Sequence, residues 1–354
     1  MREGSDAAAA LGEVVREQLG VNVVASQPLP AGLGPRRFVR LILDGPPGRL
    51  VARIDADEDP AGRPSAAAPE PALEPLRSFL EDAGLPVPAR HGGDWARGVE
   101  LLEDLGERTL ERAAAEASSE ERRALYAQAC ALVPRLQALS DPGGEIPAFG
   151  RRLDGALFAY KAGLFSRFSL PLALGRDPRR SEIQAVERAF LWIAERCQEA
   201  PARLAHRDFQ SQNLLLRAES GGSPQIIMID LQGAFLAPPE YDLVCLLRDS
   251  YAELPDEEVR EHLERVRPSL PDAPDPETFA RRFDLLTLTR KGKDHARFVH
   301  ASQRRDDPRY LVHLPATVRA LRAAAPRCAG LDPCLVPLCA WIEALPLETP
   351  PCAP

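Results

Sequence analysis

The sequence predicts an α+β fold in which a small β-rich N-terminal part precedes a larger, mainly helical part. Two observations support this prediction. Two apolar segments on either side of a Gly-Pro turn indicate a β-hairpin near the N-terminus, and amphipathic helical patterns occupy residues 107–140 and 181–200. Because 354 residues exceed the size of one simple core, we expect two domains, residues 1–103 and residues 104–354.

The elements of the N-terminal part follow from local patterns. Alanines and leucines at helical spacing end at Gly20, a plausible C-cap, and the glycine- and proline-rich turn 44–48 separates the two strands of the hairpin. The expected elements are, in chain order, a helix over 7–20, strands over 37–43 and 49–55, a helix over 73–83 and a strand over 99–102.

The C-terminal part is expected to be helical around one short β unit. A strand–loop–strand pattern occupies residues 203–236, with a turn at 221–224. Helices resume near Tyr241, apart from proline-rich breaks near 268–276 and after Leu345.

Composition excludes several classes of protein. The formal net charge of -8 argues against general affinity for nucleic acid or for an anionic membrane. The seven cysteines, an odd number without a Cys-x-x-Cys pair, predict buried thiols rather than a disulfide framework. The N-terminus lacks the apolar core of a signal peptide and no apolar run is long enough to span a membrane, so we expect a cytoplasmic protein. The sequence leaves the oligomeric state open.

The segment from His206 to Asn213 reads H-R-D-F-Q-S-Q-N, which matches the order H-R-D-x-x-x-x-N. Phosphoryl transfer needs a carboxylate beside the attacking hydroxyl and oxygen ligands for Mg²⁺ between the phosphates. Asp208 supplies the carboxylate as the candidate catalytic residue, and Asn213 supplies a side-chain oxygen for the metal. This segment therefore predicts a kinase that uses ATP and Mg²⁺.

A second carboxylate follows a short apolar strand, I-I-M-I, at residues 226–229. Asp230 comes twenty-two residues after Asp208, a spacing that fits a hairpin returning Asp230 beside Asn213 as a second metal ligand. A lone aspartate after a strand is more often a turn or a helix cap. The three residues in this order and spacing are specific for phosphoryl transfer.

The N-terminal domain is expected to bind the nucleotide. Gly32 and Gly34 precede the hairpin, and glycine lets backbone N–H groups approach phosphates, although two glycines alone often mark only a turn. Arg53, on the second strand of the hairpin, is a candidate for bidentate contact with the α- and β-phosphates. The alternative is an ordinary outward-facing strand arginine.

Three further residues complete the predicted nucleotide site. Glu74, or less favourably Glu70, opens the following helix and is a candidate to hold Arg53 in place; its alternative is a solvated carboxylate favoured by the helix dipole. Glu103 and Leu105 lie in the link after the strand over 99–102. Their backbone would hydrogen-bond the adenine edge, or the link is an ordinary connector.

These motifs together resemble those of the aminoglycoside phosphotransferase and choline kinase superfamily. The resemblance extends over the chain from about Leu33 to Leu321. Within it, the chain is most similar to bacterial anomeric kinases for N-acetylmuramate and N-acetylglucosamine. The stretches that carry the resemblance are L-L-E-D-L-G-E-R-T at 101–109, H-R-D-F-Q-S-Q-N at 206–213, D-L-Q-G-A at 230–234 and Y-D-L-V-C-L-L-R-D at 241–249.

The resemblance implies a bilobal protein-kinase-like fold, with an N-terminal nucleotide-binding lobe and a C-terminal catalytic and substrate-binding lobe. It implies Asp208 as the catalytic base, Asn213 and Asp230 as Mg²⁺ ligands, and Asp242 as a brace for the backbone of the catalytic loop. Only about ten residues separate Asp230 from Glu240, too few for the activation segment of a protein kinase. A small-molecule acceptor is therefore expected.

The leading hypothesis is an ATP-dependent kinase that phosphorylates a sugar or amino-sugar hydroxyl, with the anomeric position as one option. Two alternatives stay open: an aminoglycoside- or choline-type kinase, and a catalytically silent nucleotide-binding protein. Acidic residues in the acceptor pocket would favour cations, whereas amides and arginines would favour N-acetyl sugars or acids. The candidate acceptor residues are Gln210, Gln212, Asp284, Arg290 and Lys293.

Overall fold

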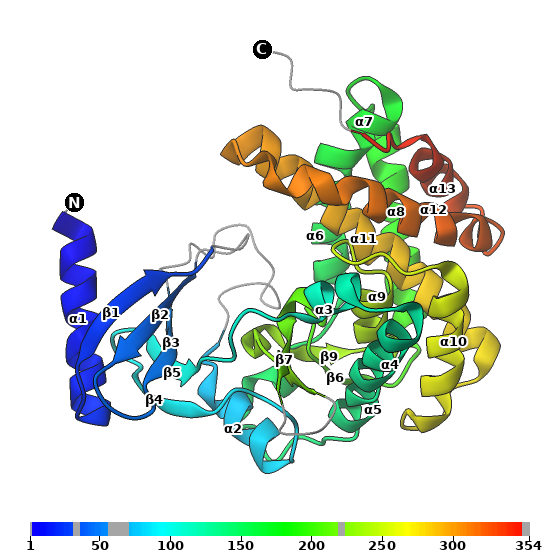
Figure 1. Ribbon diagram of the computed structural model, residues 1–354. Coiled ribbons are helices and arrows are strands. Elements are labelled where there is room, and N and C mark those ends of the chain that lie inside the picture. Colours follow the sequence, from blue (N-terminus) through cyan, green and yellow to red (C-terminus); the bar gives the residue numbers. More distant parts are fainter. Residues whose placement is uncertain (1, 31–35, 56–70, 219–223, 349–354) are drawn as a thin grey trace. The chain divides into compact units, whose positions relative to one another are not determined.

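The computed structural model describes residues 2–30, 36–55, 71–218 and 224–348, without the side chains of residues 2–9. These residues form two compact units. The sheet unit contains the described residues of 1–61, 86–108 and 215–229. The helical unit contains the described residues of 62–85, 109–214 and 230–354. The two units confirm the α+β prediction, since one is built on an antiparallel sheet and the other on helices (Figure 1).

The sheet unit holds a five-stranded antiparallel sheet in the order β1-β2-β3-β5-β4. The predicted hairpin is confirmed, because β2 has the expected bounds and β3 ends one residue before the expected Asp55. The elements are α1 (Arg2–Leu19), β1 (Val23–Pro28), β2 (Arg37–Leu43), β3 (Arg49–Ile54), β4 (Arg90–Asp94) and β5 (Val99–Glu103).

Helix α1 covers this sheet because its apolar residues recur at helical spacing. Leu11, Val14 and Val15 are buried and share one core cluster with Leu41 of β2 and Leu101 of β5. The helix ends at Gly20 as predicted, where a φ of 69° is accessible to glycine without strain and the Gly20 amide donates to the carbonyl of Arg16.

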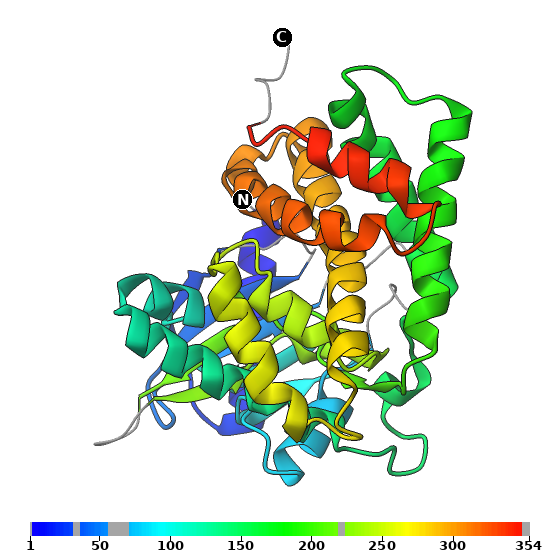
Figure 2. The ribbon, with the colours of Figure 1, turned by 90° about the vertical axis from the view of Figure 1, so that its right-hand side faces the viewer.

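The helical unit is organised around α11, which runs through its middle with α12 and α8 on either side (Figure 2). Helix α11 starts where Asp275 caps it and Pro276 occupies its first position. The α-helices of the helical unit are α2 (Glu74–Asp82), α3 (Leu110–Glu116), α4 (Ser119–Cys130), α5 (Leu132–Gln137), α6 (Gly155–Leu164), α7 (Leu170–Leu174), α8 (Arg180–Gln198), α9 (Tyr241–Leu247), α10 (Asp256–Val266), α11 (Pro276–Arg305), α12 (Leu314–Ala329) and α13 (Leu335–Ala344).

The predicted strand–loop–strand unit over 203–236 is more finely divided than expected. It contains four short strands in two pairs: β6 (Arg203–Ala205) with β9 (Phe235–Ala237), and β7 (Leu214–Arg217) with β8 (Gln225–Met228). The loop 206–213 connects the first strand of one pair to the first strand of the other. The described residues of 215–229 belong to the sheet unit, whereas the chain directly before and after this segment belongs to the helical unit.

No helix in the described part of the chain is both long enough and apolar enough to cross a membrane.

Candidate active site

The loop His206–Asn213 is held at its start by a buried carboxylate. The backbone amides of His206 and Arg207 donate to Asp242 Oδ2 and Oδ1 at 2.7 and 3.0 Å. Asp242 lies in the first turn of α9 and is 1% exposed, and burial raises its pKa to about 6. These bonds stabilise a backbone that turns through a left-handed residue, Arg207, with φ 79°. The predicted bracing role of Asp242 is confirmed.

A second carboxylate holds the far end of the same loop. The backbone amide and the hydroxyl of Ser211 donate to Asp249 Oδ2 at 2.7 and 2.6 Å. Ser211 and Asp249 are both buried, so this interaction is shielded from water. Sequence reasoning gave no role to Asp249, although it closes the Y-D-L-V-C-L-L-R-D stretch that carries part of the resemblance.

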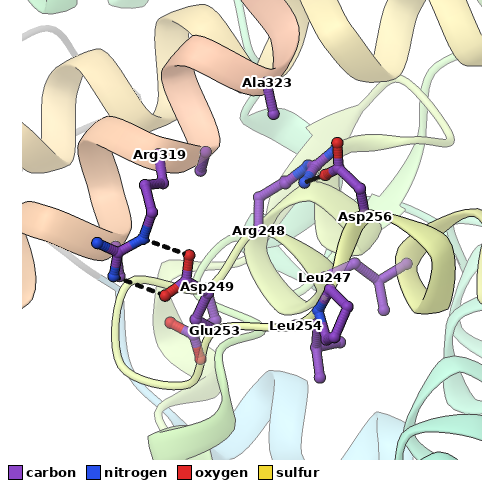
Figure 3. Close-up of a pocket in the computed structure, with 11 residues that line it drawn as sticks. Leu247, Arg248, Asp249, Glu253, Leu254, Asp256, Arg319 and Ala323 are labelled. Atoms are coloured by element: carbon purple, nitrogen blue, oxygen red, sulfur yellow. Dashed lines mark hydrogen bonds and ion pairs between the residues drawn. The ribbon is translucent and has the colours of Figure 1, made fainter.

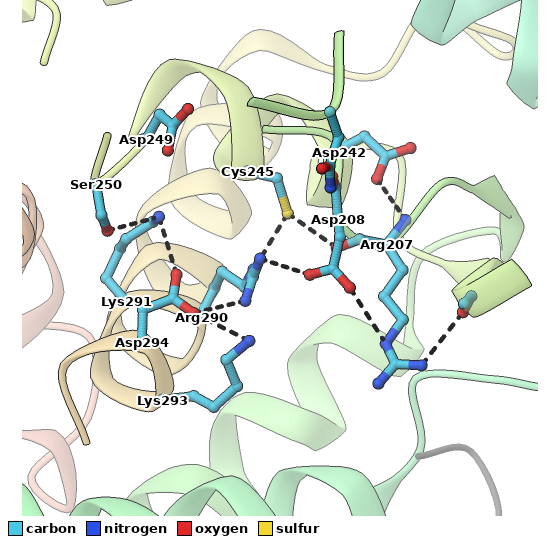
Figure 4. Close-up of polar contacts among 12 residues, drawn as sticks. Arg207, Asp208, Asp242, Cys245, Asp249, Ser250, Arg290, Lys291, Lys293 and Asp294 are labelled. Atoms are coloured by element: carbon cyan, nitrogen blue, oxygen red, sulfur yellow. Dashed lines mark hydrogen bonds and ion pairs between the residues drawn. The ribbon is translucent and has the colours of Figure 1, made fainter. Parts of the chain in front are cut away.

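The carboxylate of Asp208 is fixed by arginines. Arg290 Nη2 donates to Asp208 Oδ1 at 2.8 Å, and Arg207 Nε lies 4.0 Å from Asp208 Oδ2 (Figure 4). Burial alone would raise the pKa of Asp208, but the charges of Arg290, Lys293 and Arg207 outweigh it and hold the pKa well below its usual range. Asp208 is therefore an ionised carboxylate at neutral pH.

Arg290 is a structural partner of the candidate base, a role that the sequence did not indicate. Its side chain is buried on α11 and also donates to Asp294 Oδ1 at 2.7 Å and to the sulfur of Cys245 at 3.2 Å. Of the other helical candidates, Asp284 accepts two bonds from Arg327, at 2.6 and 2.7 Å.

Asn213 and Asp230 present oxygen atoms suited to a hard cation. The amide nitrogen of Asn213 donates to the backbone carbonyl of Asp208 at 2.8 Å, which leaves the side-chain oxygen of Asn213 as the group available for a ligand. Asp230 follows β8 in a left-handed conformation with φ 63°, and its Oδ1 accepts from Gln232 at 2.6 Å. One amide oxygen and one carboxylate form a donor set that Mg²⁺ accepts together with phosphate oxygens.

The predicted nucleotide residues lie in both units. Arg53, in β3, is 3% exposed and pairs with Asp55 Oδ1 at 2.6 Å. Glu103, at the end of β5, accepts from the guanidinium of Arg217 and from a backbone amide. Glu74 lies in the helical unit and pairs with Arg77 Nε at 2.7 Å.

The remaining members of the predicted nucleotide site are Leu105, Gly32, Gly34 and the alternative Glu70. Leu105 is partly buried. Gly32, Gly34 and Glu70 lie outside the described residues. The pairing of Arg53 with Glu74 stays a prediction.

A cavity of about 250 Å³ lies elsewhere in the helical unit, near the end of α9 (Figure 3). It is bordered by the ion pairs Arg319–Glu253 and Arg248–Asp256, and Asp249 contributes to its wall. Its lining residues are Leu247, Arg248, Asp249, Glu253, Leu254, Pro255, Asp256, Ala316, Arg319, Ala320 and Ala323. The cavity is thus distinct from the residues that surround Asp208.

With this geometry in view, a family model described as "Phosphotransferase enzyme family" matches residues 26–280. The chain belongs to this family. The matched range includes the loop 206–213, Asp230 and Asp242. The chain is therefore a phosphotransferase, and the predicted transfer of a phosphoryl group to an alcohol acceptor is confirmed.

Several curated proteins are similar over most of the chain. An N-acetylmuramate/N-acetylglucosamine kinase from Caulobacter vibrioides is 27% identical over 361 residues, which covers 96% of this phosphotransferase and 94% of the relative. A kinase of the same name from Pseudomonas aeruginosa is 28% identical over 257 residues, with 71% and 72% covered.

Solved structures support the fold. The choline kinase LicA from Streptococcus pneumoniae has a TM-score of 0.59 at 15% identity and covers 90% of this phosphotransferase and 98% of its own chain. An aminoglycoside phosphotransferase in complex with gentamicin also has a TM-score of 0.59 at 15% identity, with 88% and 97% covered. The predicted protein-kinase-like fold, with a β-rich N-terminal part and a helical C-terminal part, is confirmed.

Proposed function

We propose that this phosphotransferase is an ATP-dependent kinase that phosphorylates a hydroxyl of a sugar or amino sugar, with the anomeric hydroxyl as the first position to test. The observation that carries the proposal is the fixed, ionised carboxylate of Asp208 inside a braced H-R-D-x-x-x-x-N loop. The names of the relatives from Caulobacter and Pseudomonas support an amino sugar as the acceptor.

Asp208 orients the acceptor hydroxyl and takes its proton as the new O–P bond forms. Arg290 occupies Oδ1 at 2.8 Å, whereas Arg207 Nε is 4.0 Å from Oδ2, so Oδ2 is the oxygen that receives the hydroxyl. The low pKa of Asp208 makes it a weak base. A weak base suffices for a loose transition state, because the bond from the attacking oxygen to phosphorus is still little formed there and the hydroxyl keeps most of its proton. Positioning therefore contributes more than proton abstraction.

Asn213 and Asp230 are the residues that would hold Mg²⁺. When bound, the cation neutralises charge on the β- and γ-phosphates. The bond from Asn213 to the Asp208 carbonyl ties the orientation of a metal ligand to that of the base, since both depend on the same peptide unit.

The nucleotide is assigned to Gly32, Gly34, Arg53, Glu74, Glu103 and Leu105. Arg53 contributes a permanent positive charge for the phosphates, and the Glu103–Leu105 link contributes backbone hydrogen-bonding groups for the base. We assign nucleotide binding mainly to residues 1–103, and catalysis and acceptor binding to residues 104–354.

The test is phosphate transfer from ATP to a panel of amino sugars, aminoglycosides and choline, with wild type and Asp208→Asn. We expect wild type to phosphorylate an amino sugar and the variant to lose about 10²–10⁴-fold in kcat, with little change in KM for ATP. Phosphorylation at the anomeric position also removes the reducing end, which a reducing-sugar assay detects. Equal rates for both proteins would disprove the role of Asp208, and no transfer to any acceptor would disprove the proposed function.

A further inference from the structure

The thiol of Cys245 lies between the catalytic loop and α11. Cys245 belongs to α9, and its side chain is buried, at 0% exposure. Its Sγ donates to the backbone carbonyl of Arg207 at 3.3 Å and accepts from Arg290 Nε at 3.2 Å (Figure 4). From the sequence, Cys245 was expected only to be a buried thiol. In the structure this thiol has two polar contacts, and both are with groups that adjoin Asp208.

The first contact is with the peptide group that leads into Asp208. The carbonyl carbon of Arg207 is bonded to the backbone nitrogen of Asp208, and the peptide group is planar, so the orientation of this carbonyl fixes the direction in which Asp208 begins. Arg207 has a φ of 79°, a conformation that a non-glycine residue keeps only where its surroundings hold it. Asp242 accepts from its amide at 3.0 Å, and Cys245 donates to its carbonyl. Two residues of α9, three apart and therefore on one face of the helix, hold both backbone groups of Arg207.

The second contact is with the guanidinium that binds the Asp208 carboxylate. In the described part of the chain Arg290 donates to three acceptors, from Nη2 to Asp208 Oδ1, from Nη1 to Asp294 Oδ1 and from Nε to Cys245 Sγ. A guanidinium is planar, and its N–H groups point in fixed directions. Three acceptors in different directions therefore hold its plane in one orientation, and the sulfur is one of the three.

These contacts form a closed cycle through Asp208. The cycle runs from the Asp208 carboxylate to Arg290, from Arg290 to Cys245 Sγ, from Sγ to the carbonyl of Arg207, and back along the chain to Asp208. One branch holds the side chain of Asp208 and the other holds its backbone, and the sulfur atom belongs to both. Because a misplacement of about 1 Å can cost about 10²-fold in rate, a group that fixes these two parts relative to each other matters for catalysis.

The protonated thiol is the form that can make both contacts. Its S–H donates to the carbonyl while its sulfur accepts from Arg290, whereas a thiolate has no proton to donate. The charged groups that interact with the thiol come from four places: Asp242 on α9, Asp208 in the loop, Arg290 on α11 and Lys161 on α6. Burial raises the pKa of Cys245 despite the opposing charge of Arg290, so the thiol keeps its proton at neutral pH.

We propose that Cys245 is a positioning residue for phosphoryl transfer, which fixes the Asp208 carboxylate relative to the catalytic loop through Arg290 and through the carbonyl of Arg207. The inference goes beyond the proposed function and rests on it for the role of Asp208. Sulfur suits the two spans of 3.3 and 3.2 Å, since a hydroxyl prefers donor–acceptor distances of about 2.7–2.8 Å to oxygen. A serine at this position would therefore make the same contacts less well.

The experiment removes the same atoms from two buried sites. Cys245→Ala loses both contacts, and Cys130→Ala is the matched control, because Cys130 is also a buried thiol on a helix of the helical unit and belongs to none of the proposed sites. Both variants are assayed with ATP and N-acetylglucosamine, and thermal unfolding shows that both are folded at the assay temperature. We expect Cys245→Ala to lower kcat by about tenfold or more with KM for ATP unchanged. Cys130→Ala should keep the kcat of wild type.

The pH profile separates positioning from a general loss of packing. In Cys245→Ala the guanidinium of Arg290 is less constrained and lowers the pKa of Asp208 less, so the acid limb of kcat/KM should move to higher pH. Cys130→Ala should keep the acid limb of wild type. Equal effects of the two variants on kcat and on the acid limb would overturn the proposal, because the thiol would then contribute packing alone.

Two further variants test the contacts themselves. Cys245→Ser keeps a donor and an acceptor, so it should recover part of kcat and part of the shift in the acid limb. In an Arg290→Gln background, Cys245→Ala should move the acid limb no further, since the guanidinium through which the thiol acts is absent. A serine variant no better than alanine, or a full additional shift in the double variant, would count against the proposal.

An infrared measurement tests the cycle without catalysis. The difference spectrum between wild type and Cys245→Ala isolates the S–H stretch of this thiol. A band at lower frequency than that of a simple thiol in an apolar solvent supports donation to the Arg207 carbonyl, and a band at the frequency of the free thiol overturns the proposal. Should Asp208→Asn react as fast as wild type, the proposed role of Asp208 fails, and the infrared band still decides whether the thiol holds the loop.

Discussion

Asp208 combines two properties that oppose each other in most proteins, since it is partly buried and yet strongly ionised. Burial disfavours a carboxylate, and the balance is reversed here by Arg290 and the neighbouring cations. Arg290 itself is 2% exposed and uses three nitrogens on Asp208, Asp294 and Cys245. Among these cations, the buried Arg290 contributes most to the charge state of the candidate base.

Replacement of this arginine should change the pH dependence of the reaction. Arg290→Gln keeps a hydrogen-bond donor but removes the charge, so burial is no longer outweighed and the pKa of Asp208 rises. The active form is the ionised carboxylate; the acid limb of kcat/KM should therefore move to higher pH, by about one unit or more. The profile is measured with the neutral acceptor N-acetylglucosamine, which does not titrate in this range. An unchanged acid limb would show that Arg290 does not set the pKa of Asp208.

At the scale of elements, α9 and the residues just after it position the catalytic loop. Asp242 and Asp249 are seven residues apart in the chain and hold the loop at its two ends, at His206–Arg207 and at Ser211. The loop itself has few regular hydrogen bonds of its own. Its shape is therefore imposed by carboxylates from another element, an arrangement common in sites that need a fixed but irregular backbone.

Asp242→Asn should loosen the start of this loop. Each carboxylate oxygen of Asp242 accepts one backbone amide, and in asparagine an NH2 group, which only donates, replaces one of these oxygens. One buried donor would therefore lose its partner, at a cost of about 1–3 kcal/mol. We expect faster hydrogen exchange at the amides of His206 and Arg207 and a fall in kcat of about tenfold or more. Exchange rates are read by mass spectrometry, with the amides of α12 as the internal control. Unchanged exchange in the loop would contradict this role.

How much of this could be read from the sequence varies by element. The hairpin β2–β3 was predictable because its apolar runs flank a distinct turn. In contrast, β1 (V-V-A-S-Q-P) is largely exposed and β4 (R-H-G-G-D) contains two glycines, so neither shows alternation. Asp242 and Asp230 were found through a motif. The contacts of Asp249 and Arg290 depend on tertiary pairing between residues 38 and 82 apart, which no local pattern encodes.

At the scale of the whole molecule, the chain passes from one unit to the other between the two proposed metal ligands. Asn213 and Asp230 belong to the helical unit, and the described residues of the intervening segment 215–229 belong to the sheet unit. Each unit is thus built from segments that alternate along the chain. A change in the β7–β8 hairpin is expected to affect the positions of both ligands, since it is covalently joined to each.

Metal dependence is the corresponding prediction. Chelation with EDTA should abolish transfer, and added Mg²⁺ should restore it. Asn213→Ala and Asp230→Asn should each raise the Mg²⁺ concentration needed for half-maximal rate by about tenfold or more, because each removes one oxygen ligand or its charge. Glu277→Gln serves as a control, since Glu277 is exposed at the start of α11, pairs with Arg281 and is assigned to neither the metal nor the nucleotide. A variant with the Mg²⁺ requirement of wild type would remove that residue from the ligand set.

The small number of lysines has a practical consequence for chemical labelling. The sequence offers amine-directed reagents three lysine side chains, and all three lie within the helical unit, namely Lys161, Lys291 and Lys293. Lys161 and Lys291 are buried and the Lys293 side chain is 13% exposed. A folded molecule should thus take up such reagents slowly at lysine, and each modified lysine marks an opening of that unit. Lysine acetylation can be followed by peptide mass spectrometry with and without acceptor. Its rate measures how often this region of the folded protein opens to solvent.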